Sequence, residues 1–542
     1  MHLSFKELKG VSRLYSDYLY AYQNLAEFYN GDFRQLSSFK AIQTQIQSQK
    51  YPRQALAEIL TEQNRSFGAC QKTLANIEAL KEKECCVVFT GQQIGLFGGP
   101  LYTIYKSLTA IKVAEYLSGQ LKIKVIPIFW MAADDHDFAE INHTYFVDNQ
   151  DKLVKLEYKS QKDWNGFPAS QIVLDEKIIQ ILEILESSSQ TGKFSKEVLN
   201  KLKEFYAPAQ PYSLAFARWM SFLLSKHGLV LLDPSEARFK SLLSPIFTSE
   251  LEKNGELQNL VEKTNSRLEK LNYHRQVHKL EGVTNLFYHS PHRVHISREN
   301  GKFRWEGASN SVDSSKLVKM VENSPQDFSA NVLLRPVLES FLFPNLAHVA
   351  GPSEVAYFAQ IKALHDELKV VMPVIYPRQS LTLVEPEIKR ILVKLGIPCL
   401  EIMQDVEQAY NRIIEKKIPG QAEELLNQTQ AELKQKVEGM GKEILKIQPG
   451  LKTNLEFTIG KIDFEFNKFK DKFFQAYKKQ FKEIREELYT ARDRLYPQQG
   501  LQERTFNITH FLNRHGFDFI DYLYQSLDLD SVDHQALELN EG

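Results

Sequence analysis

The fold is decided by the stretch CCVVFTGQQIGLFGGPLYTIYKSLTAIKVAEYL (residues 85–117) followed by KIKVIPIFWMAADDHDFAEINHTYFVD (residues 122–148). Its first apolar, β-branched run, VVF, stops at Thr90, and a turn with four glycines leads into a segment whose apolar residues recur every three or four positions. A second run, VIPIFW, ends just before the acidic segment that begins at Asp134. The pattern predicts a β–loop–α–β unit. Because ligands bind beyond the carboxyl ends of strands in open α/β sheets, the polar residues after both runs are candidates for a functional site.

Three later apolar runs predict further parallel strands, at 228–234, 346–350 and 370–375. The chain is therefore predicted to be α/β, with a parallel-sheet core at 85–385. Helical and small β insertions are expected within it at about 160–215 and 245–330, where Asn300-Gly301 is a hairpin signal.

The segments around this core are predicted to be helical. Residues 1–84 are expected to form an entirely helical section packed on the core, and residues 497–542 a helical tail that docks back on it. Between them, apolar residues at alternating steps of three and four predict an antiparallel coiled-coil hairpin over 386–496. We expect a homodimer through this coiled coil, although a hairpin can also close on itself in a monomer.

Composition narrows the class of protein. The 542 residues carry a formal net charge of −1, so no global field attracts nucleic acid or an anionic membrane. No run of about 18 apolar residues is present that would cross a bilayer. The four cysteines are too few for a disulfide framework, and the N-terminus lacks the pattern of a signal peptide. We expect a reduced, cytoplasmic protein with no nucleic-acid or membrane partner.

The glycine-rich turn is the first candidate for ligand binding. Its glycines would let the backbone approach a ligand closely, and the N–H groups of the following helix would point toward it. We predict substrate contacts from Thr90, Gly91, Gln92, Gln93 and Gly95. The turn matches neither GxGxxG nor a P-loop, and several of its glycines are explained equally well by a tight β–α turn.

The acidic segment after the second strand is the strongest candidate for chemistry. Three aspartates beside one histidine repel one another unless a cation lies nearby, whether a metal ion, an ammonium group or an arginine. We predict Asp135 and His136 as catalytic residues, with the histidine as a general base. Asp137, Asn142 and His143 are predicted to bind substrate.

Two more strand-end loops carry polar residues. In the first, Gly351, Glu354 and Tyr357 would suit an amino group, and in the second, Arg378 and Ser380 would suit a phosphate or carboxylate. Arg335 is assigned the same role as Arg378, with a buried ion pair as an equal alternative. We predict no metal site, the five histidines between 274 and 295 included.

Four motifs resemble a known family: TGQQIGLFGGPLYTIYK, FWMAADDHDFAEINH, LLRPVLESFLFPNLAHVAGPSEVAYFAQ and MPVIYPRQS, with LYPQQGLQER after the helical hairpin. The chain is similar over nearly its whole length to the bacillithiol-biosynthesis enzymes that add cysteine, the cysteine ligases. This resemblance implies a Rossmann-like core with connecting-peptide insertions, as in class I aminoacyl-tRNA synthetases, and a dimerising coiled coil. It also implies a reaction, the joining of cysteine to the amine of glucosaminyl malate in the last step of bacillithiol biosynthesis.

The activation chemistry does not follow from the motifs. The glycine-rich turn has no His-Ile-Gly-His, and residues 376–380 are only loosely like Lys-Met-Ser-Lys-Ser. Because a free carboxylate must be activated before it forms an amide, we expect ATP or another nucleotide, and no metal other than magnesium.

The hypothesis is a cytoplasmic ligase in which Gln92 and Gln93, with Arg335 or Arg378, hold carboxylates or phosphate. Asp135 and His136 would orient and deprotonate the attacking amine, and Glu354 with Tyr357 would bind an amino group. Two alternatives remain open. One is a metal-dependent hydrolase using Asp135, His136, Asp137 and His143, and the other is a non-catalytic coiled-coil scaffold that binds a nucleotide.

Overall fold

The computed structural model describes residues 1–148, 150, 152–188, 192–417 and 420–540. The chain forms two compact units. The first comprises residues 1–383 with 500–537, and the second comprises 384–499 with 538–540. Parts of the predicted helical stretches at 177–206 and 386–496 fall at 189–191 and 418–419, and the last two residues of the predicted tail are 541–542; all of these lie outside the described residues.

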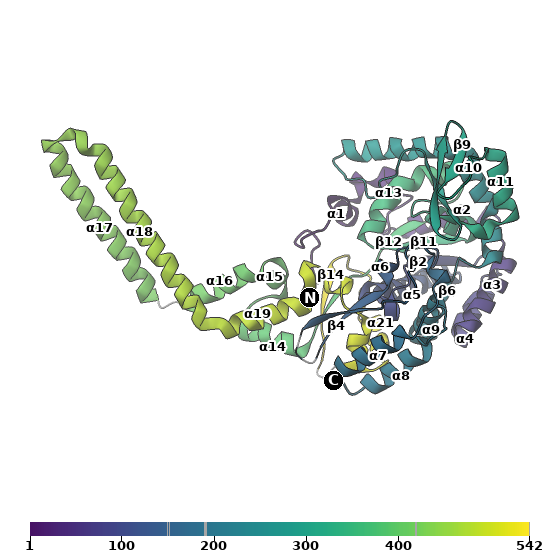
Figure 1. Ribbon diagram of the computed structural model, residues 1–542, viewed down its shortest axis with the longest axis horizontal. Helices are drawn as coiled ribbons and strands as arrows, with labels where there is room; N and C mark the ends of the chain where they lie inside the picture. The colour runs from purple at the N-terminus through teal and green to yellow at the C-terminus, as the bar shows by residue number, and fades with distance from the viewer. Residues whose placement is uncertain (149, 151, 189–191, 418–419, 541–542) are drawn as a thin grey trace. The chain divides into compact units, whose positions relative to one another are not determined.

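A five-stranded sheet forms the centre of the first unit, in the order β12-β11-β2-β3-β6, with every pair parallel (Figure 1). Its strands are β2 (Cys86–Gln92), β3 (Val125–Met131), β6 (Val230–Leu232), β11 (Asn345–Ala350) and β12 (Val374–Pro377). Val87, Val88 and Phe89 in the central strand are fully buried. Burial of each such side chain contributes about 1.5–3 kcal/mol, and continuous apolar runs are typical of strands covered on both faces.

Helices connect and cover these strands. The crossover from β2 to β3 is α5 (Leu101–Leu121), which packs on β2, β3 and β11. The crossover from β11 to β12 is α13 (Pro352–Glu367), which begins with proline at its first position and Glu354 at its third, a pattern typical of helix starts. The N-terminal section adds α1 (Arg13–Tyr20), α2 (Leu36–Gln47), α3 (Arg53–Ser66) and α4 (Gln71–Ala79). Buried Asn64 exchanges two hydrogen bonds with Leu231 of the edge strand β6.

Both predicted insertions are present. After β3 come α6 (Phe138–Ile141), the hairpin β4 (His143–Val147) and β5 (Leu153–Glu157), and the helices α7 (Lys177–Ser188), α8 (Ser195–Phe205) and α9 (Tyr212–Leu224). After β6 come α10 (Ala237–Lys270), β7 (Val283–His289), β8 (Arg293–Glu299), β9 (Lys302–Trp305), α11 (Ser314–Asn323), β10 (Phe328–Ala330) and α12 (Arg335–Leu342). These last four strands form a separate antiparallel sheet in the order β10-β7-β8-β9.

The second unit is helical. It contains α14 (Pro386–Leu395), α15 (Cys399–Gln404), α16 (Val406–Lys417), α17 (Gly420–Ile447), α18 (Lys452–Lys478) and α19 (Lys482–Leu495). Helices α17 and α18 run side by side as an antiparallel pair, joined by a short turn at 449–451 (Figure 1). Asp463 accepts hydrogen bonds from Gln430 and Lys434 across this pair. The predicted fold class, a parallel-sheet α/β core and a C-terminal helical hairpin, is confirmed.

Three predictions are wrong about short strands. The sections expected to be wholly helical at both ends of the chain contain β1 (His2–Leu3) and β14 (His534–Glu538), which form a sheet with β13 (Leu381–Val384) beside α20 (Ile508–His515) and α21 (Phe519–Ser526). Strand β12 begins at Val374 rather than at residue 370. Strands β1 and β14 have two and five residues and pair with each other across almost the whole chain, so local periodicity carries little signal there.

Candidate active site

A cavity of about 630 Å³ lies in the first unit, where β2, β3 and β11 end. This is the edge at which open α/β sheets bind ligands, and the volume is in the range of small-molecule sites. A second wall of the cavity comes from strands β7 and β8 of the antiparallel sheet and from the start of α12. Eleven of the sequence-predicted residues line the cavity: Gly91, Gln92, Gln93, Asp135, His136, Asp137, Arg335, Gly351, Glu354, Tyr357 and Arg378.

Two predicted residues of the glycine-rich turn lie outside the cavity wall. The Thr90 hydroxyl donates a hydrogen bond to the carbonyl of Val349 at 3.0 Å, which ties β2 to β11. At Gly95, a Cβ atom would lie 2.7 Å from the Cα of Gly99. The turn therefore needs glycine there because the chain folds closely on itself, which is the alternative left open above.

Three more predicted residues make contacts elsewhere. Asn142 is buried, and its backbone carbonyl accepts a hydrogen bond from Tyr158. The Nδ1 of His143 lies 3.0 Å from the carbonyl of Ala139. The Ser380 hydroxyl lies 2.7 Å from Nδ1 of His534, in the sheet formed by the chain ends. Their predicted role in substrate binding has no support from the cavity.

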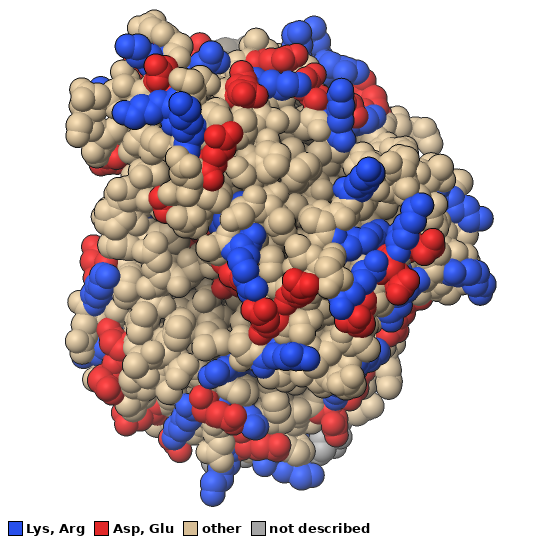
Figure 2. All heavy atoms as spheres, turned by 90° about the vertical axis from the view of Figure 1, so that its right-hand side faces the viewer, with Lys and Arg blue, Asp and Glu red and all other residues tan. Residues whose placement is uncertain are grey.

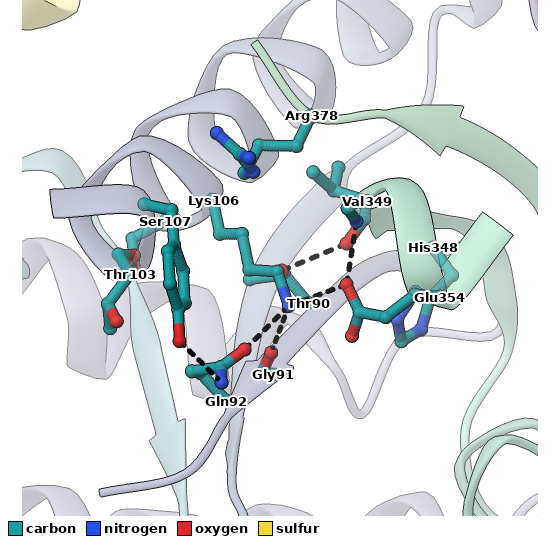
Figure 3. A network of polar contacts seen from close by, with 12 residues as sticks. Thr90, Gly91, Gln92, Thr103, Lys106, Ser107, His348, Val349, Glu354 and Arg378 are labelled. Carbon is teal, nitrogen blue, oxygen red and sulfur yellow. Dashed lines mark hydrogen bonds and ion pairs between the residues drawn. The ribbon is translucent and has the colours of Figure 1, made fainter. Parts of the chain in front are cut away.

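Lys106 organises the strand end at the glycine-rich turn, although it was not among the predicted site residues (Figure 3). Its ammonium group donates to the carbonyl of Gly91 at 2.8 Å and to Oε1 of Gln92 at 2.9 Å, and it pairs with Glu354 at 2.5 Å. The Glu354 carboxylate also accepts a hydrogen bond from the Gly351 N–H at 2.6 Å. The amino group that Glu354 was expected to bind is thus supplied by the chain itself.

Charge holds this group together in a nearly dry environment. Burial would raise the pKa of Glu354, but the adjacent Lys106 ammonium outweighs it, so that pKa lies below its ordinary value. Burial lowers the pKa of Lys106 despite the opposing effect of Glu354. Only 4% of the Lys106 side chain is exposed, so neither charge can be removed without leaving the other buried and unpaired.

Arg378 was expected to clamp a ligand anion, but its two terminal nitrogens clamp Glu503. Nη1 and Nη2 donate to the two carboxylate oxygens of Glu503 at 2.8 and 2.6 Å, and both side chains are buried. Arg378 therefore faces the cavity as part of the wall, with its bidentate fork already filled.

The acidic segment is neutralised by the chain's own partners. The Asp134 carboxylate pairs with the buried ammonium of Lys240 at 2.5 Å, and this charge outweighs burial to hold the pKa of Asp134 below its ordinary value. Asp137 caps α6 by accepting a hydrogen bond from the N–H of Glu140 at 3.2 Å. The crowding of acids is thus relieved by a lysine and a helix N-terminus.

Asp135 and His136 lie against two arginines. Oδ1 of Asp135 accepts from Arg335 at 2.7 Å and lies 3.4 Å from Arg293. Oδ2 accepts from no group in the described part of the chain. Arg293 also donates to Nδ1 of His136 at 3.0 Å. Because a guanidinium only donates, Nδ1 must be an acceptor, and the proton of the neutral ring is on Nε2.

This arrangement is unfavourable for the predicted general base. Burial and the nearby Arg293 charge both lower the pKa of His136, so the ring resists taking a second proton. With Nδ1 occupied and Nε2 protonated, His136 is arranged as a hydrogen-bond donor. Arg293 is itself 6% exposed and lies 3.7 Å over the ring of Phe287.

Replacing Arg293 with methionine is expected to raise the pKa of His136 toward its ordinary value of 6.5, because a neighbouring positive charge is removed. If protonation of His136 inactivates the enzyme, the acid limb of the pH–rate profile should then move to higher pH. Arg293→Lys, which keeps the charge, should shift it less, and Arg304→Met, on the exposed strand β9, should leave it in place. An acid limb common to all four proteins would contradict the assignment.

The metal-dependent hydrolase that was left open as an alternative needs a set of metal-binding side chains. In the described ranges, no group of three or more His, Cys, Asp or Glu side chains is arranged to hold a metal ion. Asp135 and His136 both contact Arg293, a cation at the position where that alternative needs a metal, and His143 is outside the cavity.

Sequence reasoning missed several residues that line the cavity. Besides Lys106 and Arg293, they include the pair His348 and Glu339, whose Nδ1 and Oε2 are 2.8 Å apart, while Nε2 of His348 has no hydrogen-bond partner in the described chain. The buried ammonium of Lys279 likewise has no partner there. The available signal was a charged or polar residue inside an apolar run, as in LAHVA at 346–350.

The surface agrees with the absence of a bulk charge. Lys and Arg side chains are interspersed with Asp and Glu over the face shown in Figure 2. Across the part of the chain that the structure describes, no helix has the length and apolar character needed to cross a membrane.

Comparison with known proteins identifies two matching family models that together span the chain. Residues 1–379 match "Bacillithiol biosynthesis BshC, N-terminal Rossmann-like domain", and residues 381–539 match "Bacillithiol biosynthesis BshC, C-terminal coiled-coil domain". The chain is 31% identical over 527 residues to a protein of Salinibacter ruber, covering 97% of this chain and 96% of the relative. It is 32% identical over 519 residues to one of Natranaerobius thermophilus, covering 94% of each. Both relatives carry the name "Putative cysteine ligase BshC".

Proposed function

The chain belongs to the bacillithiol biosynthesis BshC family, and on that premise we propose that it is a ligase joining the carboxyl group of cysteine to the amine of glucosaminyl malate. One observation supports this most directly: a single cavity brings together Asp135, a carboxylate with an open oxygen, and Lys279, a cation with no hydrogen-bond partner in the described chain. An acceptor amine needs the first, and anionic substrates need the second. The relatives' names favour this reading over a hydrolase or a scaffold.

The reaction needs an activated carboxyl group, for which we propose ATP or another nucleotide. The cysteine carboxylate would attack a phosphorus atom of the nucleotide and displace pyrophosphate or ADP. The amine would then attack the carbonyl carbon, and AMP or phosphate would leave with the electron pair of the broken C–O bond. Lys279 suits a phosphate of this co-substrate, because this residue lines the cavity and its buried ammonium has no hydrogen-bond partner within the described chain.

The site divides the remaining work between Asp135 and His136. Oδ2 of Asp135 would bind the amine and take its N–H proton as the C–N bond forms. His136 would donate its Nε2 proton in a hydrogen bond to the oxygen on which negative charge develops. Gln92 and Gln93 reach the same cavity from the end of β2 and would bind polar groups of the substrates.

The test is a mass-spectrometric assay of the purified full chain with glucosaminyl malate and cysteine, with and without ATP. A product with the mass of the cysteinyl amide, formed only with ATP, is expected, and AMP or ADP release identifies which bond of ATP is broken. The double variant Asp135→Asn, His136→Ala should form no product. Absence of product from the wild-type chain with every nucleotide tried would overturn the proposal.

Replacing Lys279 with methionine is expected to raise the KM for ATP by about tenfold, because one charge-assisted contact to phosphate is lost. The KM for cysteine should change little. Initial rates at varied ATP measure this, with Arg304→Met as a control for the loss of one positive charge. Equal KM values for ATP in wild type and Lys279→Met would remove Lys279 from the nucleotide site.

We also propose that the protein is a homodimer through the hairpin. Leu433, Met440, Ile444 and Ile447 on α17, and Phe457, Phe464 and Phe469 on α18, are exposed in the single chain. Large apolar side chains exposed on both helices are typical of an interaction surface, and a second copy presents the same side chains.

Sedimentation velocity tests the dimer directly. The wild-type chain is expected to sediment as a dimer, and the double variant Phe457→Glu, Phe464→Glu as a monomer. Lys461→Glu also introduces a negative charge on the same helix, but at an exposed polar position, and this variant should remain a dimer. A monomeric wild type would contradict the assignment.

We place the protein in the cytoplasm. Its four cysteines are all free thiols, as expected where thiols are kept reduced.

A further inference from the structure

The segment after the second unit returns to the active site of the first. Gln502 is fully buried, and its side-chain amide exchanges two hydrogen bonds with the backbone of Leu383, at 2.8 and 2.9 Å. Glu503 is 1% exposed, and its carboxylate accepts hydrogen bonds from both terminal nitrogens of Arg378 and from the N–H of Leu381. Two consecutive side chains thus fix the backbone at this point against strand β13 and the loop between β12 and β13.

The same segment also holds the glycine-rich turn. The side-chain amide of buried Asn507 donates toward the carbonyls of Leu96, Phe97 and Gly99, the last at 2.8 Å. The N–H of Leu101, the first residue of α5, donates to the carbonyl of Phe506 at 2.8 Å. Residues 502–507 therefore bind two of the strand-end loops that form the cavity, although no role was predicted for this segment beyond its part in the family resemblance.

Arg504 lies between these two anchors and behaves differently from its neighbours. It is exposed, it lines the cavity, and its guanidinium forms no hydrogen bond or ion pair with any described residue, although its backbone N–H donates to the carbonyl of Leu501. Its charge acts on Tyr102, whose hydroxyl accepts a hydrogen bond from Gln92 at 3.2 Å. Arg504 thus presents a guanidinium on a fixed backbone, beside a hydroxyl and an amide that also line the cavity. No acidic side chain of the described chain pairs with this guanidinium, so the three groups form a site suited to an anion from outside the chain.

We propose that Arg504 binds an anionic group of a substrate in the active-site cavity, with Tyr102 and Gln92 as neighbouring polar contacts. The chemical class is an oxyanion with paired oxygens, for which arginine has the matching geometry. Two substrates of the proposed reaction carry such groups: the malate carboxylates of the acceptor and the phosphates of the nucleotide. This inference deepens the proposed function, but its test does not depend on turnover.

The experiment is isothermal titration calorimetry of the full chain with three probes: L-malate, glucosaminyl malate and ATP. Wild type is compared with Arg504→Met, Arg504→Lys and the control Arg304→Met. Because the guanidinium of Arg504 has no partner in the described protein, its replacement should leave the thermal unfolding midpoint unchanged, so a loss of binding reports on the site itself.

A loss of about 10–100-fold in affinity for L-malate and glucosaminyl malate in Arg504→Met, with ATP affinity retained, would assign the site to carboxylate. The same loss for ATP alone would assign it to phosphate. Arg504→Lys should fall between wild type and Arg504→Met, because it keeps the charge but not the paired donors. Unchanged affinity for all three probes in Arg504→Met would overturn the inference, whether or not the wild-type chain forms product.

Discussion

Replacing Lys106 with methionine is expected to lower the free energy of unfolding by about 3–5 kcal/mol, because the Glu354 carboxylate, which is only 18% exposed, then loses its ion-pair partner. Ligase activity should be lost as well, since Lys106 also holds the carbonyl of Gly91 and the amide of Gln92 at the end of β2. Denaturation of the full chain by urea, followed by circular dichroism, measures the first effect, and the product assay measures the second.

The pH dependence of this loss has a definite sign. In the wild type the pKa of Glu354 lies below its ordinary value of 4.5, so the ion pair stabilises the fold at neutral pH and is lost as pH falls through that lowered pKa. Without the ammonium, burial should raise the pKa of Glu354 above 4.5, and a protonated Glu354 needs no partner. The destabilisation by Lys106→Met should therefore be smaller at pH 5 than at pH 7.

The double variant Lys106→Met, Glu354→Gln provides the control. It removes both charges, so it should recover part of the stability lost in the single variant, although it should remain inactive if Lys106 positions the turn. If Lys106→Met unfolds at the wild-type urea concentration at pH 7, the buried pair contributes nothing and this account of the strand end is wrong.

How much of the fold could be predicted depends on where the information lies in the chain. Strands β2, β3 and β11 are buried on both faces, so they appear as continuous apolar runs, and their order of appearance with intervening helices predicts a parallel sheet. The long helices of the hairpin were predictable for a different reason, because their apolar residues recur every three or four positions. By contrast, β1 has only two residues, and its partner β14 follows more than 500 residues later. No local pattern can report such a pairing.

The location of the site could be predicted from the sequence, but the contacts among its side chains could not. The strand-end rule located the edge, and most predicted residues do line one cavity. It could not show that Arg378 would be occupied by Glu503, or that Arg293 of the antiparallel sheet would reach His136, because each pair joins segments separated by more than 100 residues. The acids and cations expected to bind substrates were in several cases binding each other.

Replacing His136 with alanine is expected to lower kcat by about 10²–10³-fold, the usual cost of removing one hydrogen-bond donor from a developing oxyanion. Stability should fall by only about 1 kcal/mol, because a single hydrogen bond is lost. Arg293 still donates to Ser329 and to the carbonyl of Ala330 in that variant. Single-turnover rates and urea denaturation separate the two effects, and a large loss of both would mean that His136 is structural.

A glutamine at the same position distinguishes a donor from a base. Its amide can donate a hydrogen bond but cannot take a proton in this pH range. If His136 is a base, His136→Gln should be as inactive as His136→Ala. If His136 donates its Nε2 proton, as the contact from Arg293 to Nδ1 requires of a neutral ring, His136→Gln should recover a measurable part of kcat. The structure favours the second outcome, because a ring that already accepts from a guanidinium must overcome that positive charge to gain another proton.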